Sequence, residues 1–161
     1  MRQLWNESWD VNVTGTQILT DAFVPLLLKS SNPRLMFIAS GTSSMTNHSN
    51  QTLPLDKLSP PGWPKANFAE TMTGFPAYRS SKTGMNMMMR EWDRLLRNDG
   101  VKVWCISPGF LATGLGQTPE ANKKMGGGDP VPAGDFVRDV VEGSRDHDAG
   151  KVISKNGVQP W

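Results

Sequence analysis

Two side chains that together can move a proton stand four residues apart, as Tyr78 and Lys82, in the stretch from Ala77 to Met85. A tyrosine with an ordinary pKa near ~10 is a poor acid–base group at neutral pH. A cation held close favours the phenolate and lowers that pKa, so that the pair can exchange a proton with a substrate oxygen. The spacing alone fits equally well a lysine that extends along an amphipathic helix beside a partly buried tyrosine.

The residues that follow place this pair on a helix. Met85, Met89, Trp92 and Leu96 continue the spacing of three and four residues that Tyr78 and Lys82 begin, with Met88 and Leu95 on the flank. In an α-helix such residues share one face. We therefore predict a helix whose core-facing stripe carries a phenol and an ammonium group at its N-terminal end. The sequence Asn98-Asp99-Gly100 is a stop signal after it.

Three apolar runs predict the strands of a sheet. They are Arg34 to Ala39, Val101 to Ile106, and a closing strand at Gly150-Lys151-Val152-Ile153. Nearly continuous apolar runs of this length are typical of parallel strands covered on both faces. The first run ends at Ser40, and ligands of open α/β sheets bind beyond the carboxyl ends of strands. Ser40 could therefore offer its hydroxyl to a substrate, or it could be a simple turn residue.

The remaining segments supply helices and connections. Residues 8 to 29 are predicted as a long helix, kinked by Pro25, with Asn12 near its start either in a site or simply solvated. Val131 to Gly143 is predicted as a last helix. The proline-containing connection 41–76 is either a lid or wall over a substrate or a peripheral insertion. Residues 114–130 are predicted as a glycine-rich loop in which Gly126-Gly127-Gly128 is a flexible segment and not a phosphate-binding turn.

Composition limits the classes of function. The 161 residues suit one domain, 1–161, and the net charge of +2 comes without a basic run, so no nucleic-acid partner is indicated. No apolar stretch approaches the roughly 18 residues of a membrane span, and no secretory leader is evident. Cys105 is the single cysteine, lies within a predicted strand and favours a buried position and a reducing, cytoplasmic location. His48 and His147 are isolated, so no metal site is predicted.

The order of these motifs resembles the short-chain dehydrogenase/reductase family. It consists of a helix with Asn12-Val13-Thr14-Gly15, a strand into Ser40, the Tyr78-x-x-x-Lys82 helix and a strand into Pro108-Gly109. The resemblance covers about residues 6 to 154. It implies an α/β fold with a Rossmann-type doubly wound parallel sheet, here a partial sheet of about three strands with flanking helices. It also implies NAD or NADP as the cofactor, with NADP slightly favoured.

The resemblance assigns a role to each matching residue. Tyr78 matches the acid–base residue that exchanges a proton with the substrate carbonyl or alcohol. Lys82 matches the lysine that lowers the tyrosine pKa and holds the nicotinamide ribose. Ser40 matches the serine that polarises the substrate oxygen, and Asn12 the asparagine that orders a proton-relay water near the lysine. The segment lining the nicotinamide corresponds to Pro108, Gly109, Leu111 and Thr113.

The chain also departs from the family pattern. No strand leads into a glycine-rich turn, and no acidic residue follows to bind the ribose. We therefore expect the C-terminal catalytic half of such an enzyme, truncated with respect to the pyrophosphate site. Its first strand should form an open sheet edge, and an apolar face should be exposed.

Two functions remain open at this stage. The first is an NAD(P)-dependent oxidoreductase that acts on a small carbonyl or alcohol compound. The second is a catalytically inactive fragment that serves as a dimerisation or interaction module. In either case the resemblance implies a homo-oligomer formed through the Asn12 and Tyr78 helices. The sequence does not reveal the substrate or the direction of the reaction.

Overall fold

The strands form one sheet at the centre of the fold. The computed structural model describes residues 1–65 and 75–161. Within these residues the sheet has the order β1-β2-β3-β4, with β1 (Arg34–Ile38), β2 (Lys102–Ile106) and β3 (Val152–Ser154) parallel to one another. The short β4 (Gly157–Val158) runs antiparallel to β3. The three predicted strands are confirmed, and β4 is an addition that the sequence pattern did not indicate.

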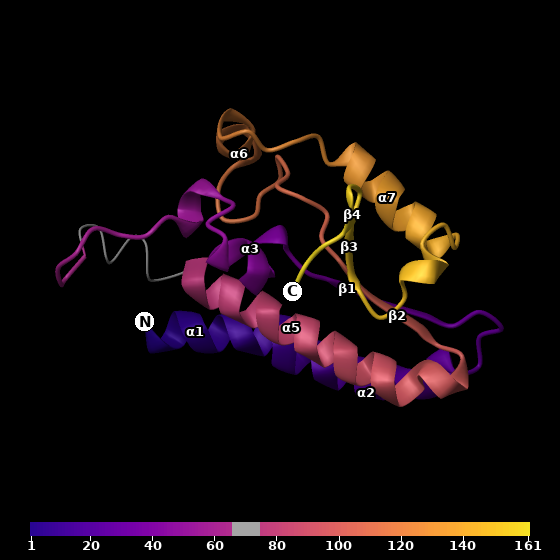
Figure 1. The fold of residues 1–161 in the computed structure, drawn as a ribbon. Helices are drawn as coiled ribbons and strands as arrows, with labels where there is room; N and C mark the ends of the chain where they lie inside the picture. Colours follow the sequence, from indigo (N-terminus) through magenta and orange to yellow (C-terminus); the bar gives the residue numbers. More distant parts are fainter. Residues whose placement is uncertain (66–74) are drawn as a thin grey trace.

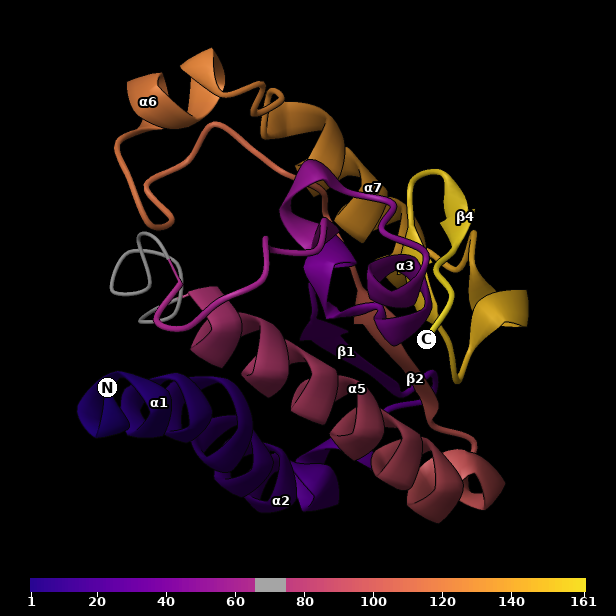
Figure 2. The same cartoon turned by 60° about the vertical axis from the view of Figure 1, so that its left-hand side comes forward.

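Helices cover both faces of this sheet, as Figures 1 and 2 show. Along β2, Val103 and Cys105 point into a core shared with the long helix α5 (Phe75–Leu96). The alternating residues Trp104 and Ile106 point the other way, into a core shared with α7 (Val131–Val141). Because successive strand residues face opposite sides, a run that is apolar throughout is buried against both layers. The α/β layered architecture is thus the one the sequence predicted.

Helix α5 carries the predicted core stripe. Met85, Met89, Trp92 and Leu96 are buried in the core, whereas Leu95 on the flank is 53% exposed. The helix continues as a short 3-10 turn, η4 (Arg97–Asp99), and then stops at Gly100, which has a left-handed backbone with φ of 78°. A glycine adopts this conformation at little cost, which explains the stop signal.

The predicted first helix begins earlier than expected and contains an irregular turn. It runs as α1 (Arg2–Trp9), a π-helical turn η1 (Asp10–Gly15) and α2 (Thr16–Leu27). The views in Figures 1 and 2 both place it alongside α5. A Cβ atom at Gly15 would lie 2.9 Å from the carbonyl oxygen of Asp10, so a glycine leaves room for this wide turn. Such turns occur frequently at functional sites.

Two segments predicted as loops contain further structure. In the connection after β1, the structure has the 3-10 turn η2 (Gly41–Ser43), the helix α3 (Met45–Ser49) and the 3-10 turn η3 (Pro54–Asp56). Residues 66–74 of the same connection lie outside the described residues. The predicted glycine-rich loop 114–130 contains the helix α6 (Pro119–Lys124), capped by Thr118. Its polar, lysine-containing sequence has no apolar periodicity, so the pattern of the sequence missed it.

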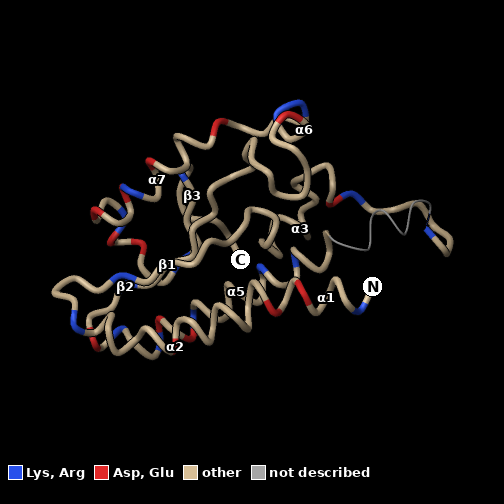
Figure 3. Tube along the Cα trace, turned by 180° about the vertical axis from the view of Figure 1, so that it is seen from behind, with Lys and Arg blue, Asp and Glu red and all other residues tan. Residues whose placement is uncertain are grey.

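The side of the molecule at α2 and β1 exposes apolar surface. Strand β1 pairs only with β2 among the described strands, and Ile38 at its end is 46% exposed. Four apolar side chains of α2 are more than half exposed: Ile18, Leu19, Phe23 and Leu26. The open edge and exposed apolar face expected from the sequence are therefore present. Along the described part of the trace, positions of basic and acidic residues are interspersed (Figure 3).

Candidate active site

The carboxyl ends of β1 and β2 form the edge at which the predicted site residues meet. The two strands are parallel and in register, with Ile38 opposite Ile106. The backbone N–H of Ala39 donates to the carbonyl of Ile106 at 2.7 Å, which extends the pairing by one residue. Ser40 and Pro108 therefore leave the sheet at the same edge, where α/β proteins bind their ligands.

Lys82 reaches this edge from α5. The Lys82 side chain is 9% exposed, and its Nζ donates a hydrogen bond of 2.7 Å to the carbonyl oxygen of Ile38, the last residue of β1. Nζ lies 5.8 Å from the centre of the Tyr78 ring. Burial lowers the pKa of Lys82, and the nearby Cys105 acts in the opposite sense. The structure therefore brings Lys82 and Tyr78 together beside β1, with the ammonium over the ring.

Tyr78 lies on the same helix, one turn before Lys82. Its ring is half-buried and stacks on Phe75, with 6.4 Å between the ring centres and 20° between the planes. Its carbonyl oxygen accepts a hydrogen bond of 2.9 Å from the hydroxyl of Ser81. The hydrogen bond to its carbonyl oxygen and the stacking of its ring on Phe75 therefore position Tyr78 on the helix.

Asn12 contacts α5 between the two predicted catalytic residues. Its Nδ2 donates to the Ser81 hydroxyl at 2.9 Å across 69 residues of sequence. Ser81 is fully buried, and Asn12 lies in the π-helical turn η1. Asn12 therefore hydrogen-bonds Ser81, the neighbour of Lys82, and not Lys82 itself. The sequence analysis did not predict this geometry, although Gly15, which leaves room for the wide turn, could have indicated it.

Ser40 begins the turn that follows β1. Its hydroxyl oxygen accepts a hydrogen bond from the backbone N–H of Thr42 at 3.2 Å and lies 2.9 Å from the Thr42 hydroxyl. Its carbonyl oxygen accepts from the Ser43 hydroxyl at 2.7 Å and from Nε2 of Gln159 at 3.2 Å. Ser40 is half-buried, and its contacts with Thr42 set the position of its side chain.

The segment after β2 holds the predicted cofactor-lining residues. Gly109 has φ of 99°, and no atom lies within 4 Å of the position of a Cβ there. Leu111 pairs with Gly128, and the carbonyl of Thr113 accepts a hydrogen bond of 2.8 Å from Nδ2 of Asn122. Pro108, which is half-buried, directly follows the strand.

Asn122 supports the predicted cofactor-lining segment, and the sequence analysis missed it. It is buried, and its Nδ2 donates to the carbonyl oxygens of Thr113 and Leu115. A Cβ atom at Gly127 would lie 2.8 Å from the Asn122 carbonyl, so this glycine permits a close backbone approach. Gly126 to Gly128 therefore connect the segment after β2 to α6 through backbone hydrogen bonds, whereas the sequence predicted a flexible segment. Only the capping Thr118 before Pro119 signalled a helix there.

Other reactive groups do not join this edge. Cys105 is fully buried, and burial raises the pKa of its thiol to about 12, so it stays protonated at neutral pH. Its predicted burial is confirmed.

Among residues 1–65 and 75–161, no group of three or more His, Cys, Asp or Glu residues could hold a metal ion. Within the same residues, no helix has both the length and the apolar character that a bilayer crossing requires.

A pocket of about 460 Å³ lies on another flank of α5. Seven residues line it: Ser43, Met45, Thr83, Asn86, Met87, Arg90 and Trp161. It includes none of Asn12, Ser40, Tyr78 and Lys82. We assign the candidate active site to the carboxyl edge of β1 and β2, because a buried cation lies beside a phenol ring there, whereas the pocket contains none of the predicted site residues.

Comparison with known proteins bears on the family to which the chain belongs. The family model described as short chain dehydrogenase matches residues 67–124. The chain is 52% identical over 169 residues to the short-chain dehydrogenase/reductase eupG of Phoma sp, with 99% of this chain and 59% of the relative covered. It is also 52% identical to the short-chain dehydrogenase/reductase tropE of Talaromyces stipitatus, with 100% of this chain and 60% of the relative covered.

Solved structures show the same fold. The chain resembles the NADPH-bound carbonyl reductase from chicken fatty liver with a TM-score of 0.73 at 19% identity, covering 100% of this chain and 58% of that one. The predicted membership of the short-chain dehydrogenase/reductase family is therefore confirmed, as is the partial Rossmann-type sheet. The chain spans about three fifths of the length of the curated relatives it matches.

Proposed function

We propose that this sequence carries the catalytic part of an NAD(P)-dependent oxidoreductase that transfers hydride between a nicotinamide and a small carbonyl or alcohol compound. The observation that carries the proposal is the buried Lys82, which is held against the end of β1 beside the Tyr78 ring. A buried cation is costly unless it is bound, and such groups cluster at functional sites. In this position the Lys82 ammonium group lies close to Tyr78 and can hydrogen-bond a ligand at the carboxyl ends of the strands.

Each residue has a distinct task in this proposal. Tyr78 donates its phenolic proton to the substrate oxygen during reduction and takes it back during oxidation. Lys82 holds its ammonium group beside the Tyr78 ring and binds the nicotinamide ribose. The Ser40 hydroxyl hydrogen-bonds the same substrate oxygen and fixes its orientation, while Asn12 holds the helix turn around Ser81 that separates Tyr78 from Lys82.

The residues at the carboxyl edge fit the nicotinamide end of the cofactor. The open space over Gly109 admits a planar ring against the backbone. The Lys82 ammonium group donates one hydrogen bond to the Ile38 carbonyl oxygen and has further N–H groups for ribose hydroxyls. Pro108, Leu111 and Thr113 would line the ring. When bound, the nicotinamide supplies or accepts the hydride. We favour NADP over NAD, and the NADPH named for the avian carbonyl reductase supports that choice.

The test is a thermal-melting titration of the chain with NADPH and with NADH. A ligand at about 100 times its dissociation constant adds about 2.7 kcal/mol to the free energy of unfolding, which gives a readily measured shift. We expect a saturable rise with at least one cofactor. A flat melting temperature up to millimolar concentrations of both would contradict the proposal for this chain.

A second candidate function rests on the apolar face of α2. Ile18, Leu19, Phe23 and Leu26 are exposed on a helix that also packs along α5, which suits an interface with a second copy of the chain. We propose a homo-oligomer formed through α1, α2 and α5, which serves the enzyme or, in the alternative, is the main role of an inactive module. Light scattering of the wild type and of the Phe23→Glu variant tests it, since the variant should be monomeric. A cytoplasmic location stays a prediction.

A further inference from the structure

The turn after Ser40 decides where the Ser40 hydroxyl points. The backbone N–H of Thr42 donates to the Ser40 hydroxyl oxygen, and the Thr42 hydroxyl lies 2.9 Å from the same oxygen. Because one oxygen lone pair receives the Thr42 N–H, the direction left for the Ser40 hydroxyl depends on the backbone of the Thr42 turn. Any group that holds Thr42 therefore acts on Ser40.

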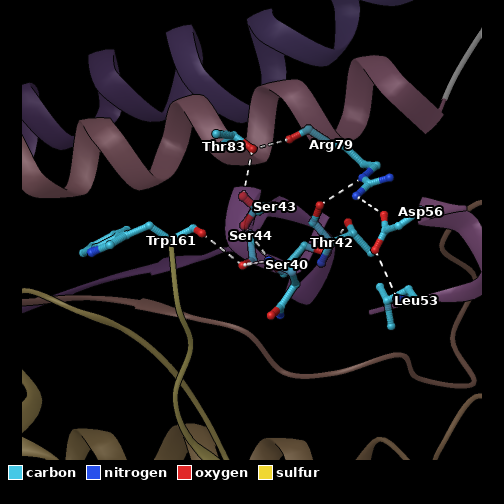
Figure 4. A network of polar contacts seen from close by, with 10 residues as sticks. Ser40, Thr42, Ser43, Ser44, Leu53, Asp56, Arg79, Thr83 and Trp161 are labelled. Carbon is cyan, nitrogen blue, oxygen red and sulfur yellow. Dashed lines mark hydrogen bonds and ion pairs between the residues drawn. The ribbon is translucent and has the colours of Figure 1, made fainter. Parts of the chain in front are cut away.

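Arg79 holds Thr42 from the helix. Its Nε donates to the Thr42 carbonyl oxygen at 2.9 Å, and its Nη2 donates to Oδ1 of Asp56 at 2.7 Å, as Figure 4 shows. Arg79 directly follows Tyr78 in α5. One guanidinium group thus ties the helix at the proposed acid–base residue to the turn that bears Ser40. The planar fork of arginine allows both bonds at once, whereas lysine has a single nitrogen.

Asp56 fixes the guanidinium in place. The Asp56 side chain is fully buried, that of Arg79 is 15% exposed, and the second carboxylate oxygen of Asp56 accepts from the backbone N–H of Leu53 at 3.2 Å. Burial by itself would raise the pKa of Asp56, but the hydrogen bonds from Arg79 and Leu53 outweigh it and the pKa lies below its ordinary value. A buried ion pair of this kind adds little net stability but restricts conformation.

We propose that the Arg79–Asp56 pair is a positioning device that clamps the Thr42 turn to α5 and thereby sets the orientation of the Ser40 hydroxyl relative to Tyr78. The inference deepens the proposed function, since it rests on Ser40 as the group that binds the substrate oxygen. Arg79 and Asp56 act through Thr42 and are positioning residues. The clamp also couples the η3 turn at residues 54–56 to Ser40, more than ten residues earlier in the chain.

Residue-resolved amide hydrogen exchange tests the clamp without cofactor or substrate. The Thr42 amide reports the hydrogen bond to Ser40 directly. In the Arg79→Lys variant we expect its exchange to rise about tenfold, which corresponds to about 1.4 kcal/mol of local opening free energy. Exchange of the β2 amides should stay within about twofold of the wild type, because the core is untouched. The matched control is Arg94→Lys, which alters an exposed ion pair with Glu91 on the same helix and should leave Thr42 unchanged.

The Asp56→Asn variant provides the second arm, also in case Arg79→Lys fails to fold. It should speed exchange at Thr42, and the double variant should exceed the faster single variant by less than about twofold, because both residues act through one contact. Unchanged Thr42 exchange in both variants, or a rise matched by the β2 amides, would overturn the proposal. These results are independent of cofactor binding, so a failed cofactor titration and a failed clamp are distinguishable. Where the wild type shows a cofactor-induced melting shift, Arg79→Lys should keep it, and a selective loss would contradict action through Ser40.

Discussion

Replacing Lys82 with methionine separates a functional lysine from a structural one. The change keeps an unbranched side chain of similar length in a site where the lysine is 9% exposed. It removes the charged donor that bonds the Ile38 carbonyl at 2.7 Å, and charged hydrogen bonds of this kind contribute about 1.5–3 kcal/mol. It also removes the cost of keeping a cation out of water, which offsets that loss.

The two contributions lead to a small net effect on folding. Replacing a buried charge by an apolar group of similar volume is often close to neutral, so we expect the free energy of unfolding at pH 7 to change by about 1 kcal/mol or less. Cofactor-induced stabilisation should be lost in the same variant. Urea unfolding and the NADPH melting titration measure the two quantities.

The pH dependence adds a signature of the buried charge. Because burial places the folded-state pKa of Lys82 below the ordinary 10.5, the unfolded state binds more protons between these two values. The free energy of unfolding of the wild type should therefore increase relative to that of Lys82→Met as the pH rises through the folded-state pKa toward 10.5. Below the folded-state pKa, Lys82 is fully charged and the burial of its charge destabilises the folded state to the full extent.

The control is Lys102→Met, at the opposite end of the sheet. Lys102 is 37% exposed and pairs with Asp146, so its loss should cost about 1 kcal/mol or less and leave cofactor binding intact. The reasoning would be refuted if Lys82→Met lowered the free energy of unfolding by more than about 3 kcal/mol while the cofactor shift persisted, since Lys82 would then be structural.

Two further predictions concern stability. Hydrogen bonds from Arg34 and Lys102 lower the pKa of Asp146 from 3.8 to about 2, so its stabilising effect is complete above about pH 4 and is lost as the pH falls toward 2. Allowing for the 34% exposure of its side chain, Asp146→Asn should cost about 1–2 kcal/mol at pH 7 and much less at pH 2 in urea unfolding; an equal cost at both pH values would contradict this. Helix glycines form a matched pair: a Cβ at Gly84 would lie 2.8 Å from the Trp9 ring, whereas nothing lies within 4 Å at Gly134. Gly84→Ala should lower the melting temperature because the α1–α5 contact must open, whereas Gly134→Ala should raise it through about 1 kcal/mol of helix propensity, and a rise in both would refute the packing argument.

The layers of the fold could be predicted because they depend on local periodicity. The stripe from Met85 to Leu96 and the two apolar runs that became β1 and β2 each lie in a short window, and burial follows from the spacing. The order of Ser40, Tyr78 and Pro108 along these elements then placed the site at the carboxyl edge.

What the sequence concealed depends on contacts between distant residues. Asp56 and Arg79 are 23 residues apart, and Asn12 meets Ser81 across 69 residues. Polar partners of this kind leave no periodic signal. An exposed apolar face was expected from the departure from the family pattern, but its position on α2 could not be predicted, because periodicity identifies an apolar face and not whether another element covers it. The π-helical turn and α6 were missed because their sequences carry no apolar pattern of their own.

The most direct measurement of the central claim compares the wild type with Tyr78→Phe. Both chains are incubated with NADPH and a panel of small carbonyl compounds, and cofactor oxidation is followed together with the cofactor-induced melting shift. We predict turnover by the wild type and a decrease of about 10²–10⁴-fold in the variant, which loses the proton donor but keeps Lys82 and the cofactor shift. Turnover by Tyr78→Phe at the wild-type rate, or neither turnover nor a cofactor shift in the wild type, would contradict it.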